Sequence, residues 1–128
     1  IPSDHFEDFY LKPMEFVPGE GGETIPQLCQ RTKEFYETLI SNPEYQDKSI
    51  LIATHGCTTR ALLNNVYENK EDFWRGKVPM NCAVNIVDVL DGRSLLVEED
   101  KVYYGKEDWV QSHHTGLLCG IYYPGHRQ

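Results

Sequence analysis

The spacing of apolar positions divides the middle of the chain into a helix, a strand and a second helix. Between Ile25 and Ile40 the apolar residues recur every three or four positions, which predicts an amphipathic helix. Thr24 and Gln27 have the pattern of a capping box at its start. Ser41-Asn42-Pro43 predicts its end, because the residue before a proline disfavours helical backbone.

The next segment, Ile50–Ala53, is apolar without alternation. It predicts a strand buried on both faces at the centre of a parallel sheet. Cys57–Tyr67 then predicts a second helix. Elsewhere the pattern is weaker. It predicts short helices over Asp4–Leu11 and Glu71–Arg75, and a hairpin of the strands Cys82–Leu90 and Ser94–Glu98 with its turn at Asp91-Gly92. Residues 100–128 are expected to be an irregular tail.

Alternating helices and strands are typical of an α/β fold, so we expect a layered sheet with helices on both faces. The predicted strands are fewer than the about 5–6 of an ordinary sheet, and the chain begins at Ile1 instead of a methionine. We therefore expect residues 1–128 to be the C-terminal portion of a single domain, with the missing strand or strands encoded before Ile1.

Charge and cysteine content narrow the classes of function. The formal net charge is −8, so the chain lacks the basic face that non-specific binding to nucleic acid or an anionic membrane requires. No segment has the length of a transmembrane helix, and no signal-peptide pattern opens the chain. The four cysteines lie far apart without a Cys-x-x-Cys motif, which favours reduced thiols and a cytoplasmic location.

The candidate chemistry lies where the buried strand meets the second helix, at Thr54-His55-Gly56. Ligands of open α/β sheets bind at this side, and the free N–H groups of a helix N-terminus favour an anion. Gly56 allows close approach to the backbone, and Cys57-Thr58-Thr59 offers N–H groups, hydroxyls and a thiol. This combination suits a phosphate. A metal site would need ligands that the sequence lacks at the usual spacings, so no metal or organic cofactor is expected. A purely structural role for His55 is the alternative.

These residues resemble the C-terminal half of the histidine phosphatase superfamily, the phosphoglycerate-mutase-like proteins. The resemblance rests on Gly21-Gly22-Glu23-Thr24 at a helix start, the strand ending in Thr54-His55-Gly56, and Asn81-Cys82-Ala83-Val84 before the next strand, and it covers roughly residues 20 to 98. It implies that His55 is the second, phosphate-binding histidine, with Gly56, Cys57 and Asn81 beside the substrate. The family's nucleophilic histidine lies in an Arg-His-Gly motif, which this sequence does not contain.

The resemblance implies phosphomonoester hydrolysis or phosphoryl transfer through a phosphohistidine in the full-length protein, acting on a small phosphorylated substrate. This chain alone is expected to be inactive. A non-catalytic module that binds a phosphorylated ligand or a partner is the alternative. The substrate's identity and the oligomeric state have no signal in the sequence.

Other polar residues receive structural interpretations. Cys57 is expected to be a small, half-buried thiol, because the spacing to Arg60 does not fit the His-Cys-x5-Arg loop of cysteine phosphatases; a lowered pKa at the helix N-terminus is the alternative. Glu23 is interpreted as a charge at a helix N-terminus instead of the catalytic acid. Arg60 is expected at the surface or an interface, with a contact to the phosphate as the alternative. His5 is expected at the surface, and the adjacent His113 and His114 make a poor pair of ligands.

Overall fold

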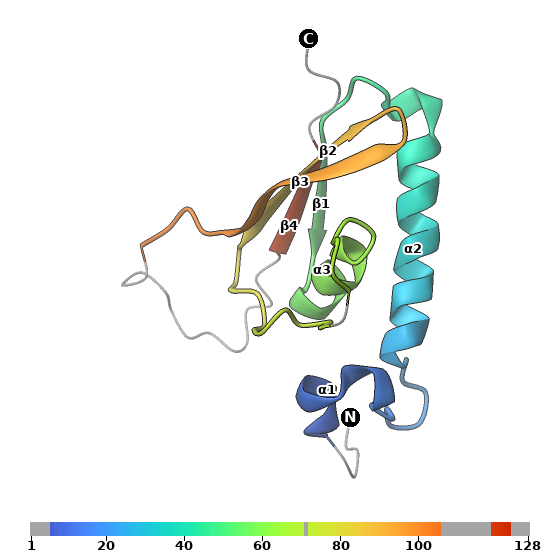
Figure 1. The fold of residues 1–128 in the computed structure, drawn as a ribbon, viewed down its shortest axis with the longest axis vertical. Helices are drawn as coiled ribbons and strands as arrows, with labels where there is room; N and C mark the ends of the chain where they lie inside the picture. Colours follow the sequence, from blue (N-terminus) through green and yellow to red (C-terminus); the bar gives the residue numbers. More distant parts are fainter. Residues whose placement is uncertain (1–5, 71, 106–118, 124–128) are drawn as a thin grey trace.

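The computed structural model describes residues 6–70 and 72–105 and the backbone of 119–123. Within these residues a four-stranded sheet in the order β1-β4-β2-β3 lies beside two longer helices (Figure 1). No helix in the described ranges is both long and apolar enough to cross a membrane. In chain order the elements are α1 (Asp8–Leu11), the 3₁₀ helix η1 (Pro13–Glu15), α2 (Ile25–Ser41), the 3₁₀ helix η2 (Pro43–Tyr45), β1 (Ile50–Thr54), α3 (Gly56–Leu63), β2 (Val84–Leu90), β3 (Arg93–Lys101) and β4 (Cys119–Tyr123).

Helix α2 has the start that its sequence predicts. The Thr24 hydroxyl accepts a hydrogen bond from the Gln27 backbone N–H at 3.2 Å, and the Gln27 side chain accepts one from the Thr24 N–H at 2.8 Å. This reciprocal pair satisfies two N–H groups that have no partner inside the helix. The helix ends at Ser41, as predicted, and Phe35 is the one member of the predicted apolar stripe that is exposed.

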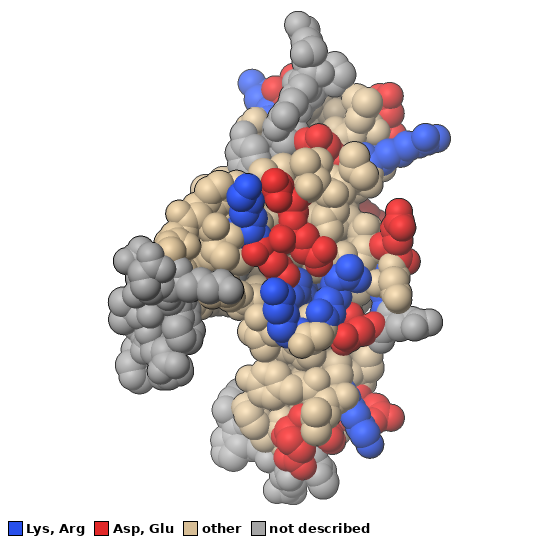
Figure 2. Space-filling model, turned by 60° about the vertical axis from the view of Figure 1, so that its left-hand side comes forward, with Lys and Arg blue, Asp and Glu red and all other residues tan. Residues whose placement is uncertain are grey.

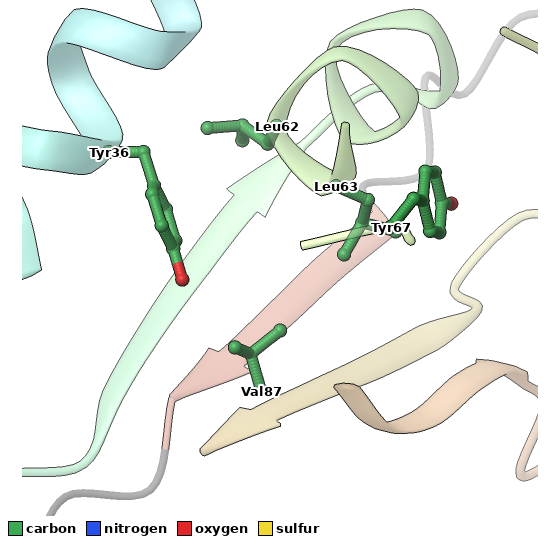
Figure 3. Packing of buried hydrophobic residues seen from close by; sticks show 5 residues of the cluster. All are labelled: Tyr36, Leu62, Leu63, Tyr67 and Val87. Atoms are coloured by element: carbon green, nitrogen blue, oxygen red, sulfur yellow. The ribbon is translucent and has the colours of Figure 1, made fainter. Parts of the chain in front are cut away.

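Two apolar clusters hold the helices against the sheet. In the first, Tyr36 of α2 and Leu62 and Leu63 of α3 pack against Val87 of β2, and Figure 3 shows these side chains pointing into the space between the helices and the sheet. The Tyr36 hydroxyl is also hydrogen-bonded to the Ser94 hydroxyl of β3. The second cluster joins the other end of α2 to α3 and to the segment after it, through Ile25, Leu28, Ala61, Phe73 and Trp74.

Strand β1 is not the central, doubly buried strand that its apolar run predicts. It lies at one end of the described strand order and pairs antiparallel with β4. Its residues alternate in exposure: Ile52 packs on the first cluster, whereas Leu51 is 72% exposed. An apolar run specifies side chains that tolerate burial on two faces, but whether both faces are covered depends on distant elements.

Both long helices pack on the same face of the sheet in the part of the chain that the structure describes. Ile52, Val87, Val89 and Leu96 contribute to the cluster beneath α2 and α3. Residues of the opposite face, including Leu95 at 66% exposed, have no helix over them among the described residues. The mixed helix and strand composition agrees with the predicted α/β class, but helices on both faces are not observed here.

Helix α3 is shorter than predicted, and the expected helix over Glu71–Arg75 is wrong for its described residues. The side-chain amide of Asn65 donates to the Leu62 carbonyl at 2.8 Å, the group that would accept from the Val66 N–H if α3 continued. The Asp72 carboxylate accepts from the Trp74 N–H at 3.1 Å, and Arg75 has a positive φ of 54°. These local features favour turns over a continuous helix.

The hairpin of β2 and β3 forms as predicted, and β3 extends to Lys101. Its turn residues Asp91 and Gly92 have φ values of 51° and 77°, which match the two left-handed positions of a two-residue hairpin turn. Strand β4 lies in the segment that the sequence predicts to be irregular. It is inserted between β1 and β2, antiparallel to the first and parallel to the second.

We predict that Thr24→Ala lowers the free energy of unfolding by about 1 kcal/mol, because it removes the N-cap acceptor of α2. Thr38→Ala is the matched control: Thr38 is exposed in the same helix, where alanine is the better helix former, so its effect should be small and stabilising. Urea unfolding followed by circular dichroism measures both. Equal effects of the two substitutions would contradict the role of the cap.

Candidate functional site

His55 occupies the junction between β1 and α3. It is exposed and has extended backbone dihedrals, φ −96° and ψ 165°, and its side chain makes no capping hydrogen bond. Its carbonyl instead receives two hydrogen bonds from Thr59, one from the backbone N–H at 2.8 Å and one from the hydroxyl at 2.9 Å. The backbone of His55 is therefore fixed by the start of α3, while its imidazole is open to solvent.

The first turn of α3 is only partly available to a ligand. Gly56 begins the helix, and a Cβ at this position would lie 3.5 Å from Pro79 Cδ and 3.6 Å from Val78 Cγ1. The segment 78–79 therefore lies directly against this turn. Thr59 is fully buried and its hydroxyl is used internally, so it does not offer the hydroxyl that the sequence suggests.

Cys57 has the environment of a packing thiol. It is half-buried against the cluster of Ile25, Leu28, Ala61, Phe73 and Trp74. Burial raises the pKa of the Cys57 thiol to about 12, and the neighbouring Cys29 and Glu23 add to the rise. The alternative of a lowered pKa at the helix N-terminus is thus wrong, because desolvation opposes the thiolate here.

Asn81 is half-buried, and it precedes β2 at the same end of the sheet as His55. Thr54 at the end of β1 pairs with Cys119, and Val84 at the start of β2 pairs with the next residue, Gly120. The Asn81 carbonyl accepts a hydrogen bond from the Tyr104 hydroxyl at 2.7 Å. The topology therefore brings the segment containing Asn81 to the end of the sheet where His55 lies.

Glu23 is held by Arg31 in a two-pronged ion pair, with both nitrogen–oxygen distances at 2.9 Å. The hydrogen bond from Arg31 lowers the pKa of the Glu23 carboxyl below its ordinary value, although burial opposes this slightly. A carboxylate that stays ionised is poorly suited to protonate a leaving group. This agrees with its interpretation as a charge near the start of α2.

Arg60 is the main correction to the predicted surface residues, because its side chain is fully buried. Its Nη2 donates to Asp100 Oδ2 at 2.9 Å and to the Lys77 carbonyl at 3.1 Å, and its Nη1 donates to the Tyr67 hydroxyl at 2.9 Å. Burial lowers the pKa of Arg60, but the hydrogen bonds and charges of Asp100 and Tyr67 raise it by a larger amount, so the net shift is upward. The Asp100 N–H in turn donates to Asn85 Oδ1 at 2.8 Å.

An open cavity of about 460 Å³ lies outside this buried pair. Figure 2 shows acidic and basic side chains mixed on one face of the molecule. Arg75 bridges to Glu99 at 3.0 Å and lies over the Tyr67 ring at 4.1 Å. None of the four residues predicted for the site lines the cavity, whose walls are Asn69, Asp72, Arg75, Lys77, Glu99 and Asp100.

The network around Arg60 was not predicted from the sequence. One signal was present: Asn85 is a polar residue in a strand that is otherwise apolar at its inward positions. In the described residues no group of three or more His, Cys, Asp and Glu side chains is arranged to hold a metal ion. His5, His113 and His114 lie outside the described residues.

Comparison with known families gives one clear finding. The model of the histidine phosphatase superfamily (branch 1) matches residues 3–100, about three quarters of the chain. Searches of curated proteins and of solved structures gave no significant match. The matched range contains His55, the first turn of α3, Asn81 and both partners of the buried Arg60–Asp100 pair.

We predict that Cys57 is alkylated slowly by iodoacetamide at pH 8, because a thiol with a pKa of about 12 is almost entirely protonated there. The rate should rise with pH up to the limit at which the protein unfolds. Cys82 is exposed and is the internal control, which should be modified first. Peptide mapping by mass spectrometry measures both rates, and modification of Cys57 as fast as Cys82 at pH 8 would contradict the assignment.

Proposed function

Because the chain belongs to the histidine phosphatase superfamily, we propose that it takes part in phosphomonoester hydrolysis or phosphoryl transfer, with His55 binding the phosphate. The observation that carries this proposal is the position of His55: an exposed imidazole at a strand end, directly before the first turn of a helix. The substrate we propose is a small phosphorylated molecule, in line with the acidic net charge of −8, which disfavours polyanionic nucleic acid.

A phosphate bound beside His55 would place its developing negative charge at the first turn of α3. The first N–H groups of α3 lack partners inside the helix, and the helix end carries roughly half a positive charge. A phosphate beside His55 and Gly56 would meet these donors, and a protonated imidazole would add a full charge. During phosphoryl transfer the charge spreads over the equatorial oxygens, so donors that are already in place lower the barrier.

In the proposed mechanism His55 is not the nucleophile. This sequence contains no Arg-His-Gly motif, so we propose that the histidine that accepts the phosphoryl group is encoded before Ile1, together with the acid that protonates the leaving group. Phosphatase activity is favoured over mutase activity because phosphatases are the wider membership of the superfamily, an argument by association. We also propose a cytoplasmic location, which the free thiols of Cys29, Cys57 and Cys82 support.

The missing motif also favours a second candidate: a non-catalytic module that binds a phosphorylated ligand on the same scaffold. The two candidates share phosphate binding at His55 and differ in turnover. The encoded sequence upstream of Ile1 distinguishes them, because an Arg-His-Gly motif at a strand end there supports the enzyme and its absence supports the binding module.

We predict that His55→Ala in the full-length protein folds normally but lowers turnover of an aryl phosphate by about 10²–10³-fold, the typical cost of one oxyanion donor. Vanadate soaked into crystals should lie against His55 and Gly56. Cys57→Ser is the matched control two residues away, and it should keep most of the activity because the Cys57 thiol is a packing group. Near-normal turnover of His55→Ala, or a loss in Cys57→Ser as deep as loss of a nucleophile, would contradict the proposal.

We also expect that residues 1–128 alone do not turn over an aryl phosphate above background, because the proposed nucleophile lies outside them. A colorimetric assay of the purified chain, with His55→Ala of the same chain as the blank, tests this. Turnover that is present in the chain and absent from its His55→Ala variant would show that the nucleophile is not missing.

A further inference from the structure

Arg60 bonds to three separate segments of the chain, 7, 17 and 40 residues away from it. Its guanidinium bonds the Asp100 carboxylate of β3, the Tyr67 hydroxyl after α3, and the Lys77 carbonyl in the loop before β2. Glu99 lies further away, with its carboxylate 3.9 Å from Nη1. The planar fork of an arginine can serve several acceptors at once, whereas a lysine ammonium is a single point of charge on a flexible stem.

The Lys77 carbonyl that accepts from Arg60 belongs to the loop that packs against Gly56, the residue after His55. Two residues after Lys77, Pro79 is buried, and its Cδ lies 3.5 Å from the Cβ position of Gly56. Val78 contacts the same position at 3.6 Å. The Lys77 N–H also donates to the Trp74 carbonyl at 3.3 Å, so both the N–H and the C=O of Lys77 are hydrogen-bonded.

We propose that Arg60 is a positioning residue for the phosphate site: it holds the segment Lys77–Pro79 against Gly56 and so sets the shape of the first turn of α3 beside His55. This inference rests on the proposed phosphate-binding function. Arg60 is fully buried and therefore acts on the site through the Lys77 carbonyl, without touching the ligand.

A role in stability alone is the competing explanation, and the energetics of buried ion pairs separate the two. Removing one partner of such a pair leaves an uncompensated charge, which is strongly destabilising whatever else the pair does. Replacing both partners by apolar residues of similar volume is often neutral or stabilising. The double variant Arg60→Met with Asp100→Leu therefore removes the bond to Lys77 and leaves no unpaired charge at these two positions.

Three variants of the full-length protein form the test. The double variant lacks the whole connection, and Arg60→Lys keeps a charge opposite Asp100 but cannot reproduce the fork. Arg75→Met is the matched control, because Arg75 bonds Glu99 and the Asn69 carbonyl beside the same cavity and has no hydrogen bond to the segment 77–79. Thermal unfolding shows whether each variant folds cooperatively.

The first readout is made without ligand: nuclear Overhauser contacts between the Gly56 α protons and the side chains of Val78 and Pro79. The second is the dissociation constant of inorganic phosphate, followed by the ring signals of His55, which are assigned by their loss in His55→Ala. We expect the double variant and Arg60→Lys to fold, to lose the contacts, and to bind phosphate about tenfold more weakly, as for the loss of about one hydrogen bond. Arg75→Met should keep both properties.

Contacts that persist in the double variant would overturn the inference, as would lost contacts with unchanged phosphate affinity. Failure of both Arg60 variants to fold would also overturn it, because Arg60 would then be required for stability itself. If phosphate does not shift the His55 signals of the unmodified full-length protein, the proposed function fails. The ligand-free contacts then still decide whether Arg60 holds the segment 77–79.

Discussion

Arg60 carries a positive charge inside the protein, and a buried guanidinium is stable only where its surroundings supply acceptors. The surroundings here are the Asp100 carboxylate, the Tyr67 hydroxyl and the Lys77 carbonyl, which come from a strand, the segment after α3 and a loop. Moving such a charge out of water costs several kcal/mol, and good geometry must offset this cost. The guanidinium therefore links these three segments, and one of them, the loop containing Lys77, packs against Gly56 through Val78 and Pro79.

At this end of the sheet, a backbone held by hydrogen bonds carries an exposed imidazole. The His55 backbone is anchored by two hydrogen bonds from Thr59, and Gly56 lies against Val78 and Pro79 on one side. The imidazole itself remains exposed. An oxyanion site benefits from this combination, because donors that are held in place before the reaction need no reorganisation during it.

Local surroundings determine the chemistry of residues that look equally reactive in the sequence. The cysteine after Gly56 lies at a helix N-terminus, which by itself would favour a thiolate, yet burial raises the pKa of Cys57 to about 12. The pKa of Glu23 shifts in the opposite direction, because the hydrogen bond from Arg31 lowers it and keeps the carboxylate ionised. Neither result follows from residue type and position in the chain, because both depend on which side chains pack nearby.

The sequence by itself determined the features that depend on neighbouring residues: the capped start and the end of α2, the left-handed turn at Asp91-Gly92, and the junction that exposes His55. Their signals are local, since a cap, a turn or a periodic face involves residues a few positions apart. Only the tertiary structure decided that β4 inserts between β1 and β2, that β1 has an exposed face, and that Arg60 is buried. These features depend on partners such as Asp100, 40 residues from Arg60, and no periodicity along the chain encodes such a pairing.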